Sequence, residues 1–349
     1  MMISSLSNLA ENERLILRTA TQRINDIANE LVKKGKALTS EQPALQNGPS
    51  AYNSDPIMLV ALVDSIVSEK RVQYRELLNV EIQTDFSLGY GLFIHSDSAA
   101  IARVISNLVN NSVEALGDQK GVIRLFFAGG DSRGVRLSIQ DNGKGISPEV
   151  LARLGQPGVT YGKEGTESGS GLGVYHARRT LESFGGGLRI ESQLAKGTTI
   201  HLEFPNAPAP NWFVEKLKLK SGMTLVTVDD DLSIIQIWTR RFGAILSDDQ
   251  SMRHKSFSSL DQFETWSQTN KPGNVLYLVD FEFLEQKSNG LDCIERLGIS
   301  DNSILVTSRY DEQPVMEKAK RIGVRMIPKG LVPFVPIDHE VEQQITIAL

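Results

Sequence analysis

The sequence predicts a multidomain α/β chain with an N-terminal helix, an α/β-sandwich domain and a second, doubly wound (βα)5 domain. Three observations support this fold class. A helical apolar repeat fills much of residues 1–50. Amphipathic helices and alternating strands are mixed across residues 51–206, and short apolar strands alternate with helices across residues 221–349. The Pro-rich stretch between the two domains, within residues 207–220, is predicted to be a linker.

The composition is that of ordinary globular protein, with 349 residues, 40% of them hydrophobic and 23% charged. A net charge of -5 gives no general attraction to nucleic acid. No apolar run approaches the roughly 18 to 20 residues of a membrane span, and the Met1 end is not a signal peptide. Cys293 is the only cysteine, so we expect a cytoplasmic chain, either soluble in itself or the cytosolic part of a membrane-anchored parent.

The first helix is predicted over residues 7–34. Its apolar residues are spaced three and four apart and form a seam at Leu17, Ala20, Ile24, Ile27 and Leu31. A single helix cannot bury such a seam, so we expect a homodimer through this helix or docking against another element. Residues 36–56 lack periodicity and are predicted to be a linker.

A helix predicted over residues 98–116 carries Asn107 and Asn111 four positions apart, on one side. A side-chain amide offers a carbonyl oxygen to a cation and NH donors to phosphate. The alternative is that both are merely exposed polar positions of a packed helix. Later in the chain, Gly169-Ser-Gly-Leu-Gly173 leads directly into a predicted helix over residues 174–184. Backbone NH groups before a helix start suit phosphates, although the same glycines would also suit a flexible loop.

A strand predicted over residues 135–140 leads into Asp141-Asn-Gly-Lys-Gly-Ile146. Asp141 is placed there to accept a hydrogen bond from an amino group, while Gly143 and Gly145 let the backbone approach a flat ring. A simple surface turn is the alternative. Residues 155–168 are predicted to form a mobile flap, and strands over residues 188–192 and 198–204 are predicted to form an antiparallel hairpin.

In the second domain, four predicted strands each end in polar residues. Residues 223–228 are followed by Asp229 and Asp230, residues 275–279 by Asp280, residues 304–306 by Thr307, and residues 324–327 by Lys329. In an open α/β sheet the strand carboxyl ends meet at one crevice. Clustered carboxylates would repel one another unless a divalent cation joined them, so Mg2+ is expected there. Asp280 is then a candidate nucleophile for a phosphoryl group, with Thr307 and Lys329 binding the phosphoryl oxygens. The alternative is a set of strand-end turns, where Asp is common.

Taken in order, the motifs of residues 55–206 resemble the ATP-binding catalytic domain of sensor histidine kinases, within the gyrase, Hsp90, kinase and MutL superfamily. The resemblance implies a binding site for ATP and Mg2+ made of an Asn-rich box (Asn107, Asn111), an adenine box (Asp141, Gly143, Gly145), a phosphate-lid box (Gly169, Gly171, Leu172, Gly173) and a final Gly-Thr element (Thr198). It further implies that Asn111 holds the Mg2+ ion and that Asp141 reads the adenine amino group.

Residues 221–349 resemble a response-regulator receiver domain. That resemblance implies Mg2+ bound by Asp229, Asp230 and Asp280, with Asp280 as the phosphoacceptor and Thr307 and Lys329 as switch residues. Two features depart from the family pattern. The chain reads FEFLEQKSNG after Asp280, and Gly330 follows Lys329.

Asn107 separates subclasses of the superfamily, because hydrolysing members usually carry a glutamate there that activates water. An amide cannot act as that base near neutral pH, which favours a kinase over an ATPase. A histidine kinase also needs a phosphoacceptor histidine. None of the five histidines lies in residues 1–50. We therefore expect the acceptor upstream in a longer parent protein or on a partner.

The sequence thus predicts the catalytic and receiver portion of a hybrid sensor histidine kinase in a two-component phosphorelay. Its expected partners are a second copy of the chain, a histidine-bearing helix, and a downstream response regulator or phosphotransfer protein. One alternative is a non-catalytic nucleotide-binding module whose receiver controls assembly. Another is a serine kinase of the anti-sigma type, which the attached receiver disfavours.

Overall fold

The computed structural model describes residues 56–128, 134–152, 173–270, 272–284, 286 and 288–340. The chain divides into two compact units, residues 1–208 and 209–349, and each is described by itself. The predicted N-terminal helix, the predicted flap at residues 155–168, and Gly169, Gly171 and Leu172 lie outside the described residues.

A five-stranded mixed sheet forms one layer of the first unit. Its spatial order is β2 (Val80–Asp85), β4 (Gly121–Ala128), β5 (Val135–Asp141), β7 (Gly197–Phe204) and β6 (Gly187–Gln193). β2 runs parallel to β4, and the remaining neighbours are antiparallel. The pairing of β6 with β7 confirms the predicted hairpin.

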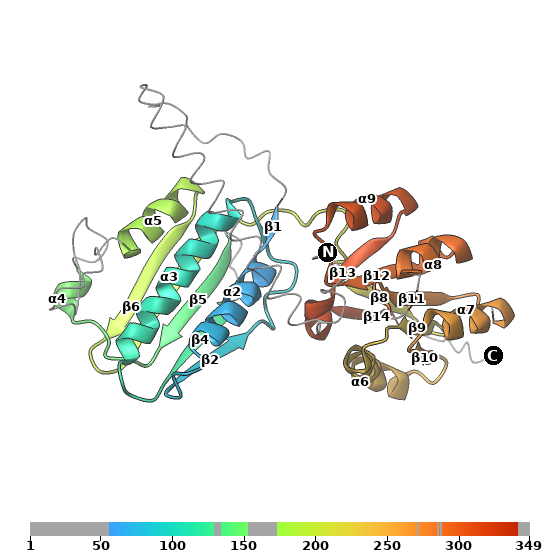
Figure 1. Ribbon diagram of the computed structural model, residues 1–349, viewed down its shortest axis with the longest axis horizontal. Helices are drawn as coiled ribbons and strands as arrows, with labels where there is room; N and C mark the ends of the chain where they lie inside the picture. The colour runs from blue at the N-terminus through green and yellow to red at the C-terminus, as the bar shows by residue number, and fades with distance from the viewer. Residues whose placement is uncertain are drawn as a thin grey trace, which may run out of the picture. The chain divides into compact units, whose positions relative to one another are not determined.

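Three helices of the first unit cover one face of this sheet, as Figure 1 shows: α2 (Leu59–Gln73), α3 (Ser98–Leu116) and α5 (Gly173–Ser183). α3 lies between the other two. Its apolar residues Ile101, Ile105 and Leu108 have no exposed surface, as the helical periodicity predicts. The Asp97 side chain accepts a hydrogen bond from the Ala100 NH and so caps the start of α3. A short helix, α4 (Pro148–Leu151), follows β5.

The apolar period of residues 56–73 predicts a helix that begins at Pro56, but α2 does not begin there. Two residues, β1 (Ile57–Met58), instead pair antiparallel with β3 (Phe93–Ile94), and the helix begins at Leu59. The pairing buries Phe93 and Ile94 almost completely. Strands this short show no alternation in the sequence, because the period cannot be read from two residues.

The second unit contains a five-stranded parallel sheet with the spatial order β10, β9, β11, β12, β13. The strands are β9 (Thr224–Val228), β10 (Arg253–Phe257), β11 (Val275–Asp280), β12 (Ser303–Thr307) and β13 (Arg325–Pro328). The connecting helices are α6 (Leu232–Asp248), α7 (Leu260–Thr269), α8 (Gly290–Leu297) and α9 (Gln313–Ile322). Counting these strands in chain order gives 2-1-3-4-5, a doubly wound topology. The edge strand β10 carries a largely polar sequence, and for that reason apolar patterning did not predict it.

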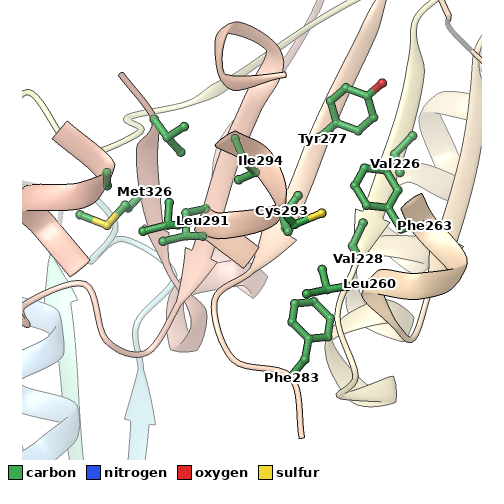
Figure 2. Packing of buried hydrophobic residues seen from close by; sticks show 14 of the residues in the cluster. Val226, Val228, Leu260, Phe263, Tyr277, Phe283, Leu291, Cys293, Ile294 and Met326 are labelled. Atoms are coloured by element: carbon green, nitrogen blue, oxygen red, sulfur yellow. The ribbon is translucent and has the colours of Figure 1, made fainter. Parts of the chain in front are cut away.

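The core of the second unit lies between the sheet and helices α7, α8 and α9. Figure 2 shows Phe263 near Val226 and Tyr277, and Leu291 near Met326. Across the sheet from α8 and α9, α6 packs with Trp238 stacked on Phe242, ring centroids 5.2 Å apart. Both faces of the sheet are covered, as a parallel sheet requires.

The (βα)5 prediction requires a fifth helix after β13. That prediction is wrong for the described residues, which continue to Glu340. After β13 come a 3-10 helix, η3 (Lys329–Phe334), and a strand, β14 (Ile337–Glu340). Pro333 and Pro336 account for this difference, because proline lacks the NH that an α-helix interior needs. β14 pairs in parallel with β8 (Leu217–Lys220), so the end of the predicted linker at residues 207–220 is a strand.

A second part of that predicted linker covers the edge of β13. The Trp212 carbonyl accepts a hydrogen bond from the Met326 NH at 2.7 Å, and the Val214 NH donates to the Met326 carbonyl at 3.1 Å. Trp212 also stacks on Tyr310, with ring centroids 5.7 Å apart. Backbone pairing to a distant strand therefore determines the conformation of this segment.

Candidate functional site

Two groups of predicted site residues come together, one in each unit. In the first unit, α3 presents Asn107 and Asn111 on its exposed side while its apolar residues face the sheet. The start of α5 adjoins Asn111, since a Cβ atom on Gly173 would lie 3.8 Å from the Asn111 Nδ2 atom. Residues from the predicted Asn-rich and phosphate-lid boxes are therefore neighbours.

Asp141 ends β5 and is only 6% exposed. Its Oδ1 atom accepts hydrogen bonds from the backbone NH groups of Gly143, at 3.0 Å, and Thr198, at 3.3 Å. Burial raises the pKa of Asp141, and these hydrogen bonds oppose the rise. A buried carboxylate held in this way has a fixed orientation and can accept further hydrogen bonds.

The sequence reasoning missed Ser112, which joins α3 to this carboxylate. The Ser112 hydroxyl donates to the Asp141 Oδ2 atom at 3.2 Å, and Ser112 is only 3% exposed. A polar residue at a buried position of an amphipathic helix was the available signal, because a buried hydroxyl needs a partner. Ser112 lies next to Asn111 in the sequence, so one helix turn contributes to both the amide face and the carboxylate.

Gly143 and Gly145, the two glycines after Asp141, each lie against the backbone of another segment. Neither position has room for a side chain. A Cβ atom on Gly143 would lie 2.6 Å from the Ala115 carbonyl oxygen. Gly145 has a φ of 63°, and a Cβ atom there would lie 2.0 Å from the Gln193 carbonyl oxygen. The chain after β5 is thus held closely against α3 and β6. The turn therefore has a fixed backbone beside the buried Asp141 carboxylate.

In the second unit, Asp229 and Asp230 follow β9, and Asp280 is the last residue of β11. One carboxylate oxygen from each of the three lies within 4.8 Å of the others. β9 and β11 are adjacent parallel strands, so their carboxyl ends meet at one edge of the sheet. The sequence prediction that these residues converge agrees with this arrangement.

Lys329 neutralises part of this acidic cluster. Its Nζ atom lies 3.0 Å from the Asp229 Oδ1 atom and 2.8 Å from the Asp280 Oδ2 atom, and all three side chains are at most 6% exposed. Burial, and then the neighbouring Asp229 charge, raise the pKa of Asp280. Burial likewise raises the pKa of Asp229 to about 6, against the lowering effect of Lys329.

The remaining polar atoms around the cluster show what it can bind. The Asp229 Oδ2 atom is buried and has no hydrogen-bond partner within the described chain. The Asp230 Oδ2 atom accepts from the Leu284 NH at 2.7 Å, and the Asp280 Oδ1 atom accepts from the Phe281 NH at 2.7 Å. An orphaned carboxylate oxygen beside two further carboxylates fits a hard divalent cation such as Mg2+.

Thr307 ends β12 and is 1% exposed, on the strand next to β11. Its hydroxyl oxygen accepts a hydrogen bond from the Arg309 NH at 3.0 Å, so it is held by the turn that follows the strand. The Arg309 guanidinium lies over the Phe281 ring, 5.1 Å from the centroid. Thr307 and the residue after Asp280 are therefore linked through Arg309.

Comparison with known proteins finds a family match within the first unit. Residues 96–208 match the family described as histidine kinase-, DNA gyrase B-, and HSP90-like ATPase. This range contains α3, β5, α5, β6 and β7, and so Asn107, Asn111, Asp141 and Thr198. The chain therefore has a mixed α/β fold that includes a histidine-kinase-like ATPase domain, and the resemblance predicted from the motifs is confirmed for these residues.

Relatives with established names include Sporulation kinase D of Bacillus subtilis (strain 168), 28% identical over 190 residues, which are 54% of this chain and 34% of that protein. Sensor histidine kinase ZraS of Escherichia coli (strain K12) is 37% identical over 190 residues, 54% of this chain and 37% of that protein. The chain thus spans about a third of the length of these two relatives.

A solved structure of full-length ShkA in complex with AMPPNP is 16% identical and covers 84% of this chain and 55% of that one, with a TM-score of 0.40. Among the described residues, no helix is both long and apolar enough to cross a membrane.

Proposed function

We propose that this chain is the catalytic and receiver portion of a hybrid sensor histidine kinase acting in two-component phosphorelay signalling. The observation that carries the proposal is the buried, hydrogen-bonded Asp141 beside the amide face of α3, within the range that matches the ATPase family. The three carboxylates at the strand ends of the second unit support the receiver part.

In the first unit, the Asp141 carboxylate would accept a hydrogen bond from the adenine amino group, and Gly143 and Gly145 would allow the backbone to lie close to the ring. Asn111 would hold a Mg2+ ion, which would neutralise phosphate charge. Gly169, Gly171, Leu172 and Gly173 would contribute backbone NH groups to the phosphates. Asn107 carries an amide and cannot activate water, so transfer of the phosphoryl group is favoured over hydrolysis.

The terminal phosphoryl group passes to an imidazole nitrogen of a histidine outside this sequence, and ADP leaves. In the second unit, an Asp280 carboxylate oxygen then attacks the phosphorus, and the bond to the histidine nitrogen breaks. Lys329 and Thr307 stabilise the charge on the phosphoryl oxygens. Asp229, Asp230 and Asp280 would hold a Mg2+ ion, which would orient the phosphoryl group.

The partners of this activity are proposed on the same basis. The N-terminal helix, residues 7–34, would form a homodimer through its apolar seam. The acceptor histidine would lie on a helix of a longer parent protein or of a partner. A response regulator or a phosphotransfer protein would receive the phosphoryl group downstream. This scheme assigns the chain to the cytoplasm.

A phosphosite search by mass spectrometry tests the proposal. The full chain is incubated with Mg-ATP and a supplied histidine-bearing helix, and separately with acetyl phosphate. We expect phosphohistidine on the helix in the first reaction and phosphoaspartate at Asp280 in the second. Asp141→Asn should abolish the first reaction only, and Asp280→Ala the second only. Label on the Asp280→Ala variant would contradict the receiver assignment, and phosphohistidine on the chain itself would contradict an external acceptor.

A second candidate function is a regulatory module that binds nucleotide without transferring phosphate. This candidate is favoured because a histidine kinase needs a phosphoacceptor histidine, and the N-terminal helix contains none. The five histidines of the sequence are His95, His176, His201, His254 and His339. Binding of ATP with no label on any supplied histidine helix would support this candidate. Loss of binding in Asn111→Ala fits both functions, so phosphotransfer is the measurement that separates them.

A further inference from the structure

The start of the second unit, residues 209–214, follows directly on the first unit in the chain and is called the joining segment below. It packs against the strand that leads to Lys329. The Trp212 carbonyl accepts a hydrogen bond from the Met326 NH at 2.7 Å, and the Val214 NH donates to the Met326 carbonyl at 3.1 Å. Lys329 follows Met326 at the end of β13. Phe213 and Val214 are 3% and 0% exposed, so this part of the joining segment is firmly anchored.

Trp212 is the less anchored part of the joining segment. Its ring stacks on Tyr310 with a centroid distance of 5.7 Å and an interplanar angle of 23°, and both residues are only partly buried. Tyr310 lies in the turn after β12, next to Arg309, whose NH donates to the Thr307 hydroxyl oxygen at 3.0 Å. The stack can therefore respond to a movement of this turn while Phe213 stays in place.

Both carboxylate oxygens of Asp280 already have partners, and each partner leads toward the joining segment. The Oδ1 atom accepts from the Phe281 NH at 2.7 Å, and the Oδ2 atom lies 2.8 Å from the Lys329 Nζ atom. The Arg309 guanidinium lies over the Phe281 ring, 5.1 Å from its centroid, and Arg309 directly precedes Tyr310. A phosphoryl group that bonds to either oxygen takes a lone pair and the negative charge of that oxygen. The contact made by that oxygen therefore weakens.

We propose that a phosphoryl group on Asp280 loosens the stack of Trp212 on Tyr310 and thereby changes the conformation of the joining segment. The inference rests on the proposed function, because that function places the phosphoryl group on Asp280. A bond at Oδ1 disturbs the turn after β12 through Phe281. A bond at Oδ2 lets Lys329 follow the phosphoryl oxygens, which shifts β13. Both routes end at Trp212.

The coupling between the stack and Asp280 acts in both directions, because two linked equilibria change each other by the same factor. The stack stabilises the turn in the arrangement that keeps the present partners of the Asp280 carboxylate. It therefore opposes binding of a phosphoryl group, and removing the stack should strengthen that binding. The gain is limited to the stabilisation that one aromatic pair supplies, about 2- to 10-fold in affinity.

Binding of beryllofluoride to the full chain, in the presence of Mg2+, tests the inference. Beryllofluoride bonds to a carboxylate oxygen as a phosphoryl group does, and fluorine NMR measures its affinity. We expect Trp212→Ala to bind it about 2- to 10-fold more tightly than the unmodified chain. Trp212→Phe keeps a ring on Tyr310 and should bind as the unmodified chain does. Trp266→Ala is the matched control, because Trp266 is also partly buried but lies on α7, and its affinity should be unchanged.

Tryptophan fluorescence follows the stack itself. Adding beryllofluoride and Mg2+ should change the emission of the unmodified chain, and this change should be lost in Trp212→Phe. Asp280→Ala offers beryllium no oxygen at this position and should show no change. An emission change that persists in Trp212→Phe would place the response at Trp238 or Trp266 and would overturn the inference.

The outcomes separate this inference from the proposed function. If the unmodified chain binds no beryllofluoride and acetyl phosphate does not label Asp280, the receiver part of the proposed function fails, and the inference fails with it. If beryllofluoride binds but Trp212→Ala has the affinity of the unmodified chain, or a weaker one, only the inference is overturned. If Trp212→Ala does not fold, Tyr310→Leu removes the same stack from the other side and must show the same tighter binding.

Discussion

Removing the Lys329 ammonium group should strongly destabilise the second unit. Its Nζ atom lies 3.0 Å from Asp229 and 2.8 Å from Asp280, and the three side chains are between 4% and 6% exposed. Breaking a buried ion pair by removing one partner costs about 3–5 kcal/mol, because the remaining charge stays buried and uncompensated. Lys329→Met keeps a side chain of similar length, so the expected loss at pH 7 is of this size. A whole domain is stable by only about 5–15 kcal/mol.

The loss of stability in Lys329→Met should depend on pH. The pKa values of the two carboxylates determine whether the loss grows or shrinks as pH rises. Burial raises the pKa of Asp229 to about 6 and raises that of Asp280 above its ordinary value, while Lys329 lowers both. Without the ammonium group, both folded-state pKa values rise further. The folded variant then binds protons that the unfolded chain does not, so its free energy of unfolding falls as pH rises through this range. The variant should therefore lose less stability at pH 5 than at pH 7.5.

Urea unfolding followed by tryptophan fluorescence measures this in the full chain. All three tryptophans, Trp212, Trp238 and Trp266, lie in the second unit, so the signal reports that unit alone. The control is Lys216→Met, which removes an exposed ion pair with Asp338 at 2.8 Å and should change stability little. A loss below about 1 kcal/mol for Lys329→Met at pH 7, or a larger loss at pH 5, would refute the reasoning.

Further predictions follow from single features of the structure. Mg2+ binding to the second unit, measured by calorimetry, should weaken as pH falls below about 6, because Asp229 becomes protonated there; an affinity independent of pH between 5 and 7 would contradict this. Gly145→Ala should destabilise the first unit by at least about 1–3 kcal/mol in thermal unfolding, since its φ is 63° and a Cβ atom would meet a carbonyl oxygen at 2.0 Å; an unchanged melting temperature would show that the turn rearranges. Trp212→Ala should destabilise the second unit measurably, but by less than the ~3–5 kcal/mol of a fully buried aromatic, because Trp212 is partly buried and stacks on Tyr310. Unchanged stability of that variant in urea would exclude a structural role for the stack.

Much of the fold was predictable because it depends on local patterns. The apolar period of α3 required one buried side, and the structure buries Ile101, Ile105 and Leu108 as expected. The alternation in residues 188–204 required a strand pair. The prediction failed where residues respond to distant partners: β8 looks like a linker, and it is a strand only because β14 pairs with it more than a hundred residues later. β10 is polar because an edge strand need not be apolar on both faces.

For the candidate sites, the sequence by itself determined which kinds of side chain are available and at which strand or helix ends they lie. Asn107 and Asn111 share a helix side because of the helical period, and Asp229 and Asp280 share a sheet edge because parallel strands end together. Only the tertiary structure decided the contacts between elements. Ser112 meets Asp141, and Lys70 meets Asn110, because α3 packs against β5 and α2 at one particular register. Such contacts join residues 29 and 40 positions apart, and no local period carries information across that distance.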